Sequence, residues 1–295
     1  MTLRQAQGTR RQAQGRSSGR GPTRRGPEVA RHLVLLLLAL VFLLPFYVIL
    51  RNALATPAEL ASASWVWWPA DPSLDNLRRL FADPNVRFAR SLLNSAVVSV
   101  LQTLLTVVIS AMAGYGLARI PSRASRLVLG LTVLTLMVPT TVTFVPAFVM
   151  VSSLGWISTL RGLVVPVLFS AFATFLFRQF FSGFPVELEE AAAIDGAGRW
   201  RTFTRVVLPN AWGICAAVGT ITFLNAWNSF LWPLLIGQDP AYRTVQVALS
   251  AYTSSQRVDT AQVFMGSAVA ILPVLVVFLV LQRQLVQGVE RSGID

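Results

Sequence analysis

The sequence FPVELEEAAAIDGAGRWRTFTRVVLP occupies residues 184–209 and joins two long apolar runs, 162–181 and 210–236. A membrane-spanning helix needs about 20 predominantly apolar residues. Both runs meet this requirement, and the polar segment between them does not. We therefore predict two transmembrane helices joined by a segment that lies outside the membrane.

The connecting segment 184–209 carries the signals of two short helices. Pro185 can start a helix, and three glutamates follow in the first turn, where the helix dipole stabilises carboxylates. Three alanines come next, and alanine is the strongest helix former. Gly196 then interrupts the helix, and a second amphipathic stretch ends at Leu208-Pro209. The segment is predicted to be a helix, a glycine turn and a second helix.

The alanines of this segment favour a docking surface, because small side chains allow another helix or surface to approach closely. Glu190 adds a charge that can pair with an arginine of a partner. The competing interpretation is a solvated connector that only joins two spans. A connector of that kind does not need an outward-facing alanine patch, so we favour docking.

Working outward from this segment, six apolar runs are long enough to span a bilayer. The runs are 33–50, 92–118, 127–151, 162–181, 210–236 and 262–284. We predict an all-α, polytopic membrane protein with six transmembrane helices. Pro139 and Pro146 lie around a cluster of threonines in the third run and predict a kink or hinge there.

The composition agrees with a membrane protein. The chain has 295 residues, of which 54% are hydrophobic and 13% are charged, whereas soluble domains carry about 25% charged residues. All 25 basic residues are arginine, so the chain has no lysine to grip a nucleotide phosphate. A single histidine, His32, and a single cysteine, Cys215, exclude an internal disulfide and a Cys/His metal cluster. We expect no catalytic residues, no metal and no cofactor.

The arginines set the expected orientation. Residues 1–31 form a polar tail that repeats RQAQG and holds eight of the 25 arginines; we predict that this tail is disordered. If the tail is cytoplasmic, 17 arginines face the cytoplasm and 8 face outward, as the positive-inside rule requires. Most arginines lie in the tail and in short loops, which favours contact with membrane lipid over nucleic-acid binding.

This orientation divides the chain into four parts and places both termini in the cytoplasm. They are the tail 1–31, the first span with an extracytoplasmic segment 32–91, a core of five spans 92–286 that contains the segment 184–209, and a cytoplasmic C-terminal tail 287–295. A secretory signal cleaved near Ala53-Leu54-Ala55 is the alternative for the first run. That run contains Pro45 and exceeds the length of about 7–15 residues that is typical of signal peptides.

Two other stretches carry polar or aromatic residues in a recognisable pattern. Trp65, Trp67 and Trp68 in the outer segment are typical of an element at the bilayer surface, and a sugar-stacking platform is the alternative. On an ideal helix, one face of the fifth run carries polar residues and a tryptophan: Thr222, Asn225, Asn228, Ser229 and Trp232. These residues either line a substrate pathway or form hydrogen bonds between helices.

The second run carries small and hydroxyl residues at helical spacing. They are Ser95, Ser99, Gln102, Thr106, Ser110 and Ala113. Residues of this kind are typical of helix–helix interfaces in membranes. We therefore predict that this face packs against neighbouring helices.

The segment 184–209 resembles the EAA motif of ABC importer permeases. The matching positions are Glu190-Ala191-Ala192, Gly196, Val206 and Leu208-Pro209, with valine where the family usually has isoleucine. Other stretches resemble the carbohydrate branch, the maltose and glycerol-phosphate permease type: LDNLRRLF at 74–81, FLNAWNSFLWPLL at 223–235 and QRQLVQGVERSG at 282–293. The resemblance covers about residues 33–293.

The resemblance implies the type I ABC importer permease fold and a heteromeric importer. The partners would be a second related permease subunit, two ATP-binding subunits and an extracytoplasmic substrate-binding protein. The motif helix would transmit ATPase closure, and the implied coupling residues are Glu190, Ala191, Ala192, Asp195, Gly196, Leu208 and Pro209. The outer loop at about 237–261 would reach into the binding protein.

The expected function is that of a non-catalytic permease subunit in the cell membrane that imports a di- or oligosaccharide, a sugar alcohol or glycerol phosphate. The alternative is a stand-alone secondary transporter. Such proteins usually keep an ionisable residue near the bilayer midplane, and the interiors of the predicted spans contain none. A membrane-embedded enzyme would need a nucleophile–base pair or a metal cluster, and the sequence offers neither.

Overall fold

The computed structural model describes residues 25–120, 122–254 and 257–290, and the chain in these ranges is almost entirely helical. The N-terminal half contains eight helices and one 3₁₀ turn: α1 Arg25–Leu54, α2 Pro57–Ala61, α3 Asp75–Ala82, α4 Phe88–Arg119, α5 Arg123–Leu136, α6 Thr140–Ser153, α7 Leu160–Val164, η1 Val165–Val167 and α8 Ala171–Ser182.

The remaining elements begin within the segment 184–209 and continue to the C-terminal helix. They are α9 Val186–Ile194, α10 Arg199–Thr202, the π-helical turn η2 Phe203–Val207, α11 Leu208–Asn210, α12 Trp212–Trp227, α13 Leu231–Ile236, η3 Pro240–Tyr242, α14 Val245–Ser250, β1 Thr253–Ser254, β2 Arg257–Val258 and α15 Thr260–Glu290. The two short strands pair antiparallel, with Thr253 opposite Val258.

Among the described residues, three of the apolar runs are single long helices and three are bent pairs of helices. Ala30–Leu54, Phe88–Arg119 and Thr260–Gln282 are each long and apolar enough to cross a membrane. The other three are bent pairs of helices: α5 with α6, α7–η1 with α8, and α10–α11 with α12, at 103°, 47° and 77°. The count reaches the predicted six if each bent pair is one span. The kink predicted near Pro139 is confirmed, because Pro139 caps α6 at the sharpest bend.

The fifth predicted run, 210–236, does not form one helix. The helix α12 ends at Trp227, and α13 begins at Leu231 after a non-helical break. Pro233 explains this break, because a proline has no N–H and its ring clashes with the carbonyl four residues earlier. In the first turn of a new helix neither problem arises. The expectation of a continuous polar face along residues 222–232 is therefore wrong beyond Trp227.

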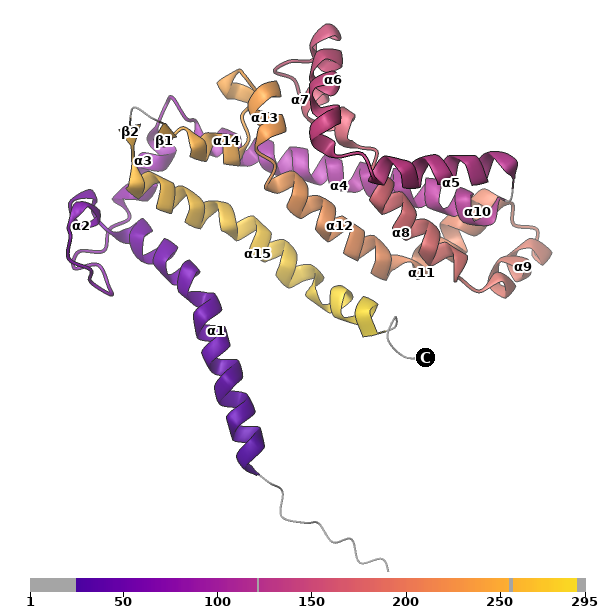
Figure 1. Cartoon of the computed structure of the whole chain (residues 1–295), viewed down its shortest axis with the longest axis horizontal. Helices are drawn as coiled ribbons and strands as arrows, with labels where there is room; N and C mark the ends of the chain where they lie inside the picture. Colours follow the sequence, from indigo (N-terminus) through magenta and orange to yellow (C-terminus); the bar gives the residue numbers. More distant parts are fainter. Residues whose placement is uncertain (1–24, 121, 255–256, 291–295) are drawn as a thin grey trace, which may run out of the picture. The chain divides into compact units, whose positions relative to one another are not determined.

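The helix α4 is the centre of the unit formed by residues 49–295. It packs against α8 and α12, and α12 in turn packs against α15 (Figure 1). At Gly114, an added Cβ would lie 2.6 Å from Phe177 Cβ and 2.8 Å from the Arg178 backbone nitrogen. This closeness requires glycine and brings the backbones of α4 and α8 together, as small residues do in membrane bundles.

The polar face of the second run is buried in this packing, as predicted. Ser95, Ser99, Thr106 and Ser110 are all buried. The Gln102 amide donates to the Leu163 carbonyl at 3.0 Å, and Thr106 Oγ1 donates to the Leu168 carbonyl at 3.1 Å. These bonds tie α4 to the α7–η1 pair, so this face is a helix–helix interface.

The ends of the chain differ from the predicted boundaries. Residues 1–24 and 291–295 lie outside the described residues, as does most of the predicted disordered tail. The helix α1 begins at Arg25, so residues 25–31 are helical, and its apolar span begins at Ala30, next to the predicted boundary at 31. The helix α15 continues to Glu290, beyond the predicted boundary at 286, while its apolar span ends at Gln282.

Candidate functional site

The segment 184–209 has the predicted order of helix, glycine turn and helix. The helix α9 begins directly after Pro185, its N-cap residue. Gly196 follows its C-terminus with φ of 76°, a left-handed conformation that favours glycine. An added Cβ at Gly196 would meet no atom within 4 Å, so only the backbone conformation requires glycine there. We call residues 184–211, with α9, α10, η2 and α11, the connecting element.

One face of α9 is bonded to the end of α4. Glu189 Oε1 accepts from Arg119 Nε at 2.7 Å, and its Oε2 accepts from the Tyr115 hydroxyl at 2.9 Å. The Arg119 guanidinium also donates to the Phe184 carbonyl. Both partners of the ion pair are largely buried, with 17% and 15% of the side chains exposed. This anchor was not predicted from the sequence, although an arginine at the end of one apolar run and a glutamate after another are a signal for it.

The opposite face of α9 is exposed. Glu190 and Ala191 are exposed, and Ile194 is 87% exposed, an unusual position for a large apolar side chain. Glu190 and Ile194 are four residues apart and share this face. Ala192, in contrast, is buried against its own chain with 9% exposed. The predicted alanine patch is therefore divided between the two faces.

The second half of the connecting element bends into α12 through a π-helical turn. Leu208 N–H bonds to the Phe203 carbonyl, five residues earlier. Pro209 follows this turn and cannot donate an N–H, which loosens the helical ladder. The Asn210 side-chain amide donates to the Val206 carbonyl at 2.7 Å and so helps to satisfy it. Leu208 and Pro209 were predicted to end the second helix. They lie instead within α11, which continues to Asn210.

A polar pocket of about 250 Å³ lies among α4, η1 and the α12–α13 break. Its lining combines amides, hydroxyls and one indole, and none of these nine residues is charged: Gln102, Thr106, Val167, Ser170, Thr222, Asn225, Ala226, Ser229 and Trp232. Trp232 Nε1 donates to the Gly162 carbonyl at 3.2 Å, which fixes its ring in the wall. We call this site the membrane pocket.

The membrane pocket contains four of the five residues predicted for one face of the fifth run. Thr222, Asn225, Ser229 and Trp232 line it, although the helix breaks between them. Asn228 does not line it, because the break turns this side chain elsewhere. Its Oδ1 accepts from Gln246 Nε2 at 3.3 Å. The predicted pathway residues are thus divided between a pocket wall and a contact with α14.

The loop after α13 is hydrogen-bonded to α4. Asn94 Nδ2 donates to the Ala241 carbonyl at 2.8 Å and to the Arg243 carbonyl at 3.0 Å. Ser95 Oγ accepts from the backbone N–H of Val245 at 2.8 Å. These contacts position η3 and α14, which belong to the loop predicted to reach into a binding protein.

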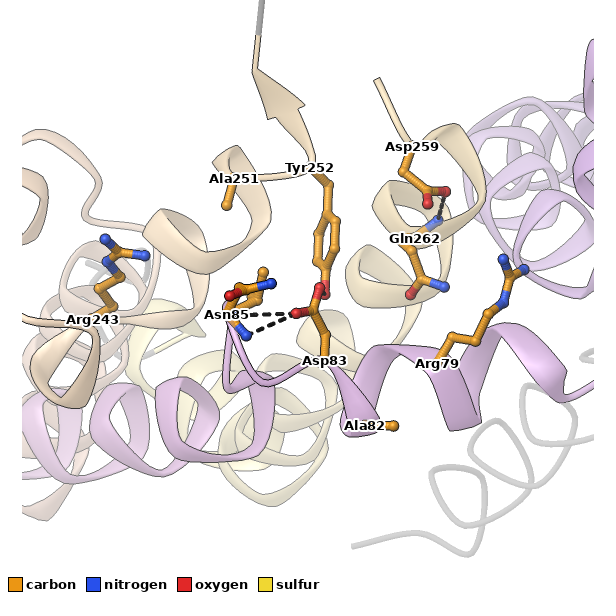
Figure 2. Close-up of a pocket in the computed structure, with 10 residues that line it drawn as sticks. Arg79, Ala82, Asp83, Asn85, Arg243, Ala251, Tyr252, Asp259 and Gln262 are labelled. Carbon is orange, nitrogen blue, oxygen red and sulfur yellow. Dashed lines mark hydrogen bonds between the residues drawn. The ribbon is translucent and has the colours of Figure 1, made fainter. Parts of the chain in front are cut away.

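A second polar pocket, of about 530 Å³, lies between the α3–α4 turn and the residues joining α14 to α15 (Figure 2). We call it the outer pocket. Asp83 Oδ2 accepts from the Tyr252 hydroxyl at 3.3 Å, and Asp83 Oδ1 accepts from the Asn85 N–H at 2.9 Å. Burial, and secondarily the carboxylate of Asp83, raise the pKa of Tyr252, so this phenol stays protonated and donates.

The tryptophans of the outer segment are exposed beside a buried arginine. Trp65, Trp67 and Trp68 each have more than half of their surface exposed, at 54%, 68% and 55%. Arg51 is 3% exposed, bonds to Glu59 at 3.1 Å and lies 4.9 Å from the Trp65 ring centroid. The arginine therefore holds this segment in place. The large exposed rings of the three tryptophans suit a membrane interface.

Within the described parts of the chain, no group of three or more His, Cys, Asp or Glu residues could hold a metal ion.

Comparisons with known proteins agree with this architecture. The family described as "Binding-protein-dependent transport system inner membrane component" matches residues 87–291. The lactose transport system permease protein LacG of Rhizobium radiobacter is 32% identical over 269 residues, 91% of this chain and 97% of LacG. The arabinooligosaccharides transport system permease protein AraQ of Bacillus subtilis is 31% identical over 270 residues, 90% of this chain and 95% of AraQ.

Two further similarities complete the comparison. The sn-glycerol-3-phosphate transport system permease protein UgpE of Yersinia pestis is 33% identical over 275 residues, covering 91% of this chain and 98% of UgpE. A bacterial ABC transporter chain involved in import of the acidic polysaccharide alginate has the same fold. Its TM-score is 0.76 at 20% identity, over 89% of this chain and 98% of that one. The chain therefore belongs to the family of inner-membrane components of binding-protein-dependent transport systems.

Proposed function

We propose that this chain is a permease subunit of an ATP-driven importer for sugars and that α9 couples it to an ATPase. Its relatives are named as transport permeases for lactose, arabinooligosaccharides and sn-glycerol 3-phosphate. The proposed partners are a second permease subunit, ATP-binding subunits and an extracytoplasmic substrate-binding protein. Both termini would lie in the cytoplasm, and the connecting element would lie on the same side.

The observation that carries the coupling role is the division of α9 into two faces. One face is bonded through Glu189 to Arg119 and Tyr115 of α4. The other presents Glu190, Ala191 and the 87% exposed Ile194. A partner that moves the exposed face would move α4 with it, because the ion pair and the buried Ala192 join the two. The connecting element would thus convert ATPase closure into movement of the central span.

The energy would come from the partner. The chain has no lysine and therefore no phosphate-gripping lysine of its own. Asn225, in α12, is exposed in the single chain. Because an amide in hydrocarbon must be satisfied by protein or water, Asn225 would face a substrate pathway or the second permease subunit.

The membrane pocket favours a neutral sugar over glycerol phosphate. Its lining offers amides and hydroxyls, which bond to sugar hydroxyls, and the Trp232 ring offers an apolar face. None of the nine lining residues is an arginine that could balance a phosphate. A volume of about 250 Å³ suits one sugar ring at a time.

Charge reversal at Glu190 tests the coupling role. The importer is assembled with its ATPase and binding protein in proteoliposomes, and ATP-driven uptake of lactose, arabinooligosaccharides and sn-glycerol 3-phosphate is measured. Glu190→Arg is expected to reduce uptake at least tenfold while the chain still inserts, because the exposed face no longer fits its partner. Asp71→Arg, an exposed charge reversal in the outer segment, is the matched control and is expected to retain uptake.

Two results would contradict the proposal. Normal uptake by Glu190→Arg would exclude α9 as the coupling helix. Substrate transport by the purified chain alone, without ATPase or ATP, would show the stand-alone secondary transporter instead.

A further inference from the structure

The outer pocket contains a buried amide that bonds to nothing in the described chain. Gln262, in the first turn of α15, is 4% exposed, and neither its Nε2 nor its Oε1 has a hydrogen-bond partner. Figure 2 shows this amide pointing into the space between the Tyr252–Asp83 pair and Arg79. Buried polar groups are almost always hydrogen-bonded, so an amide with both ends unpaired indicates a missing partner.

The walls around this amide are fixed by bonds of their own. Asp259 Oδ1 accepts from the Gln262 backbone N–H at 3.2 Å, and the Asp259 N–H bonds to the Tyr252 carbonyl at 3.0 Å. On the facing side, Asp83 receives the Asn85 N–H and the Tyr252 hydroxyl. These bonds hold Asp83, Tyr252 and Asp259 in place, and none of the three side chains is hydrogen-bonded to the Gln262 amide.

The charges of the outer pocket balance. Arg79 and Arg243 supply two positive charges, and Asp83 and Asp259 supply two negative charges. Arg79 is already paired with Asp75 at 3.3 Å. A phosphate or carboxylate entering the pocket would gain no net attraction, and it would meet two carboxylates. A neutral ligand would meet no such repulsion.

We propose that the outer pocket is a binding site for a neutral, polyhydroxylated molecule, a sugar of one or two rings. A hydroxyl both donates and accepts, so neighbouring hydroxyls can satisfy Gln262 Nε2 and Oε1 together. The Asp83 carboxylate and the Arg243 guanidinium supply a further acceptor and further donors. The volume of about 530 Å³ lies within the range of about 300–1,000 Å³ that is typical of ligand pockets.

This site is separate from the membrane pocket, with which it shares no residue. The proposal rests on the proposed function in one respect: the proposed orientation puts the outer pocket on the side from which a sugar arrives. It would hold sugar before the sugar enters the span. Its binding chemistry depends neither on ATP nor on the connecting element, so the two proposals can fail separately.

The test is direct binding to the full chain in nanodiscs, together with whatever subunits co-purify, without ATP or binding protein. Lactose and sn-glycerol 3-phosphate are titrated as probes by isothermal calorimetry. We expect lactose to bind at millimolar concentration and Gln262→Leu to weaken it at least tenfold. Gln238→Leu, an exposed glutamine outside the pocket, is the matched control and is expected to bind lactose normally.

Gln262→Leu removes an unpaired amide, so its thermal stability is expected to equal or exceed that of the parent protein. If that variant does not fold, Arg243→Gln serves instead, and a several-fold loss of lactose affinity is expected. Unchanged lactose binding in either folded variant overturns the site. Binding of sn-glycerol 3-phosphate as tight as that of lactose overturns its neutral character. If lactose binding to the chain in nanodiscs is absent but ATP-driven uptake is intact, the outer pocket is overturned and the importer function is retained. If uptake is absent but Gln262-dependent lactose binding is intact, the importer function is overturned and the outer pocket is retained.

Discussion

The connecting element and the fifth span are adjacent in the sequence but were shaped by different kinds of interaction. In α9 the start at Pro185, the acidic first turn and the stop at Gly196 all come from the local sequence. In α12 and α13, apolar residues run through residues 210–236, yet the helix breaks after Trp227. The helix α9 therefore begins and ends where its local sequence predicts. The fifth span, in contrast, breaks within a run whose hydrophobicity predicts one continuous helix.

The difference comes from how strongly each region is held by its neighbours. The separate helix α13 is fixed by Trp232, whose indole reaches the Gly162 carbonyl, and by Ile236, which is completely buried. These contacts compensate for the helical hydrogen bonds lost at the break. The exposed face of α9 has no such neighbours, so only propensity and capping shape it.

The largest effect is expected where the connecting element is anchored. Arg119→Ala leaves Glu189 largely buried without its ion-pair partner, and we expect a loss of about 2–3 kcal/mol in the free energy of unfolding. Uptake should fall at least tenfold, because α9 is no longer joined to α4. Thermal unfolding in nanodiscs and uptake in proteoliposomes measure the two effects. Arg123→Ala, at an exposed position, is the control, and equal behaviour of both variants would rule out the anchor.

The next effect concerns the site that holds α13. At Gly162 an added Cβ would run into the Trp156 carbonyl oxygen, so Gly162→Ala should lower the free energy of unfolding by about 1–3 kcal/mol. Gly213→Ala is the matched control in α12, where an added Cβ meets nothing within 4 Å. That control should be neutral or stabilising, because alanine favours helix. Equal melting temperatures of the two variants would show that packing does not fix α13.

A smaller effect is expected at the glycine turn of the connecting element. Gly196→Ala must adopt a left-handed conformation, at a cost of about 1 kcal/mol, although no atom blocks the methyl group. Gly196→Asn should cost less, because asparagine tolerates this conformation. Hydrogen exchange of the α9 amides measures the local loss of stability. If alanine and asparagine give the same protection as glycine, local conformation does not set the end of α9.

The smallest effect separates the two amides of the fifth span. Asn225→Ala removes a group from the membrane pocket and is expected to raise the KM for lactose uptake about fivefold, equivalent to about 1 kcal/mol. Asn228→Ala, outside the pocket, should leave KM within twofold of the parent value. Uptake kinetics over a range of lactose concentrations give both values. A larger effect at Asn228 would place the pathway on the α14 side of the break.

Taken by itself, the sequence determined where the apolar runs lie, the kink at Pro139 and the helix–glycine–helix order of residues 184–209. Hydrophobicity, proline and glycine act over a few residues, so these features can be predicted locally. It also carried the motif of the family to which the chain belongs. Pro233 was a local signal for the break in the fifth span, but the long apolar run concealed it.

Which face of α9 is available follows from the packing of distant helices, because it depends on Arg119, which is 70 residues away from Glu189. The packing also puts Asn225 and Asn228 in different surroundings, and it places Gln262 in a pocket with residues of α3 and residues that follow α14. Helical periodicity cannot give these answers. Each depends on side chains that meet only after distant helices pack, where an unpaired polar group carries its full desolvation cost.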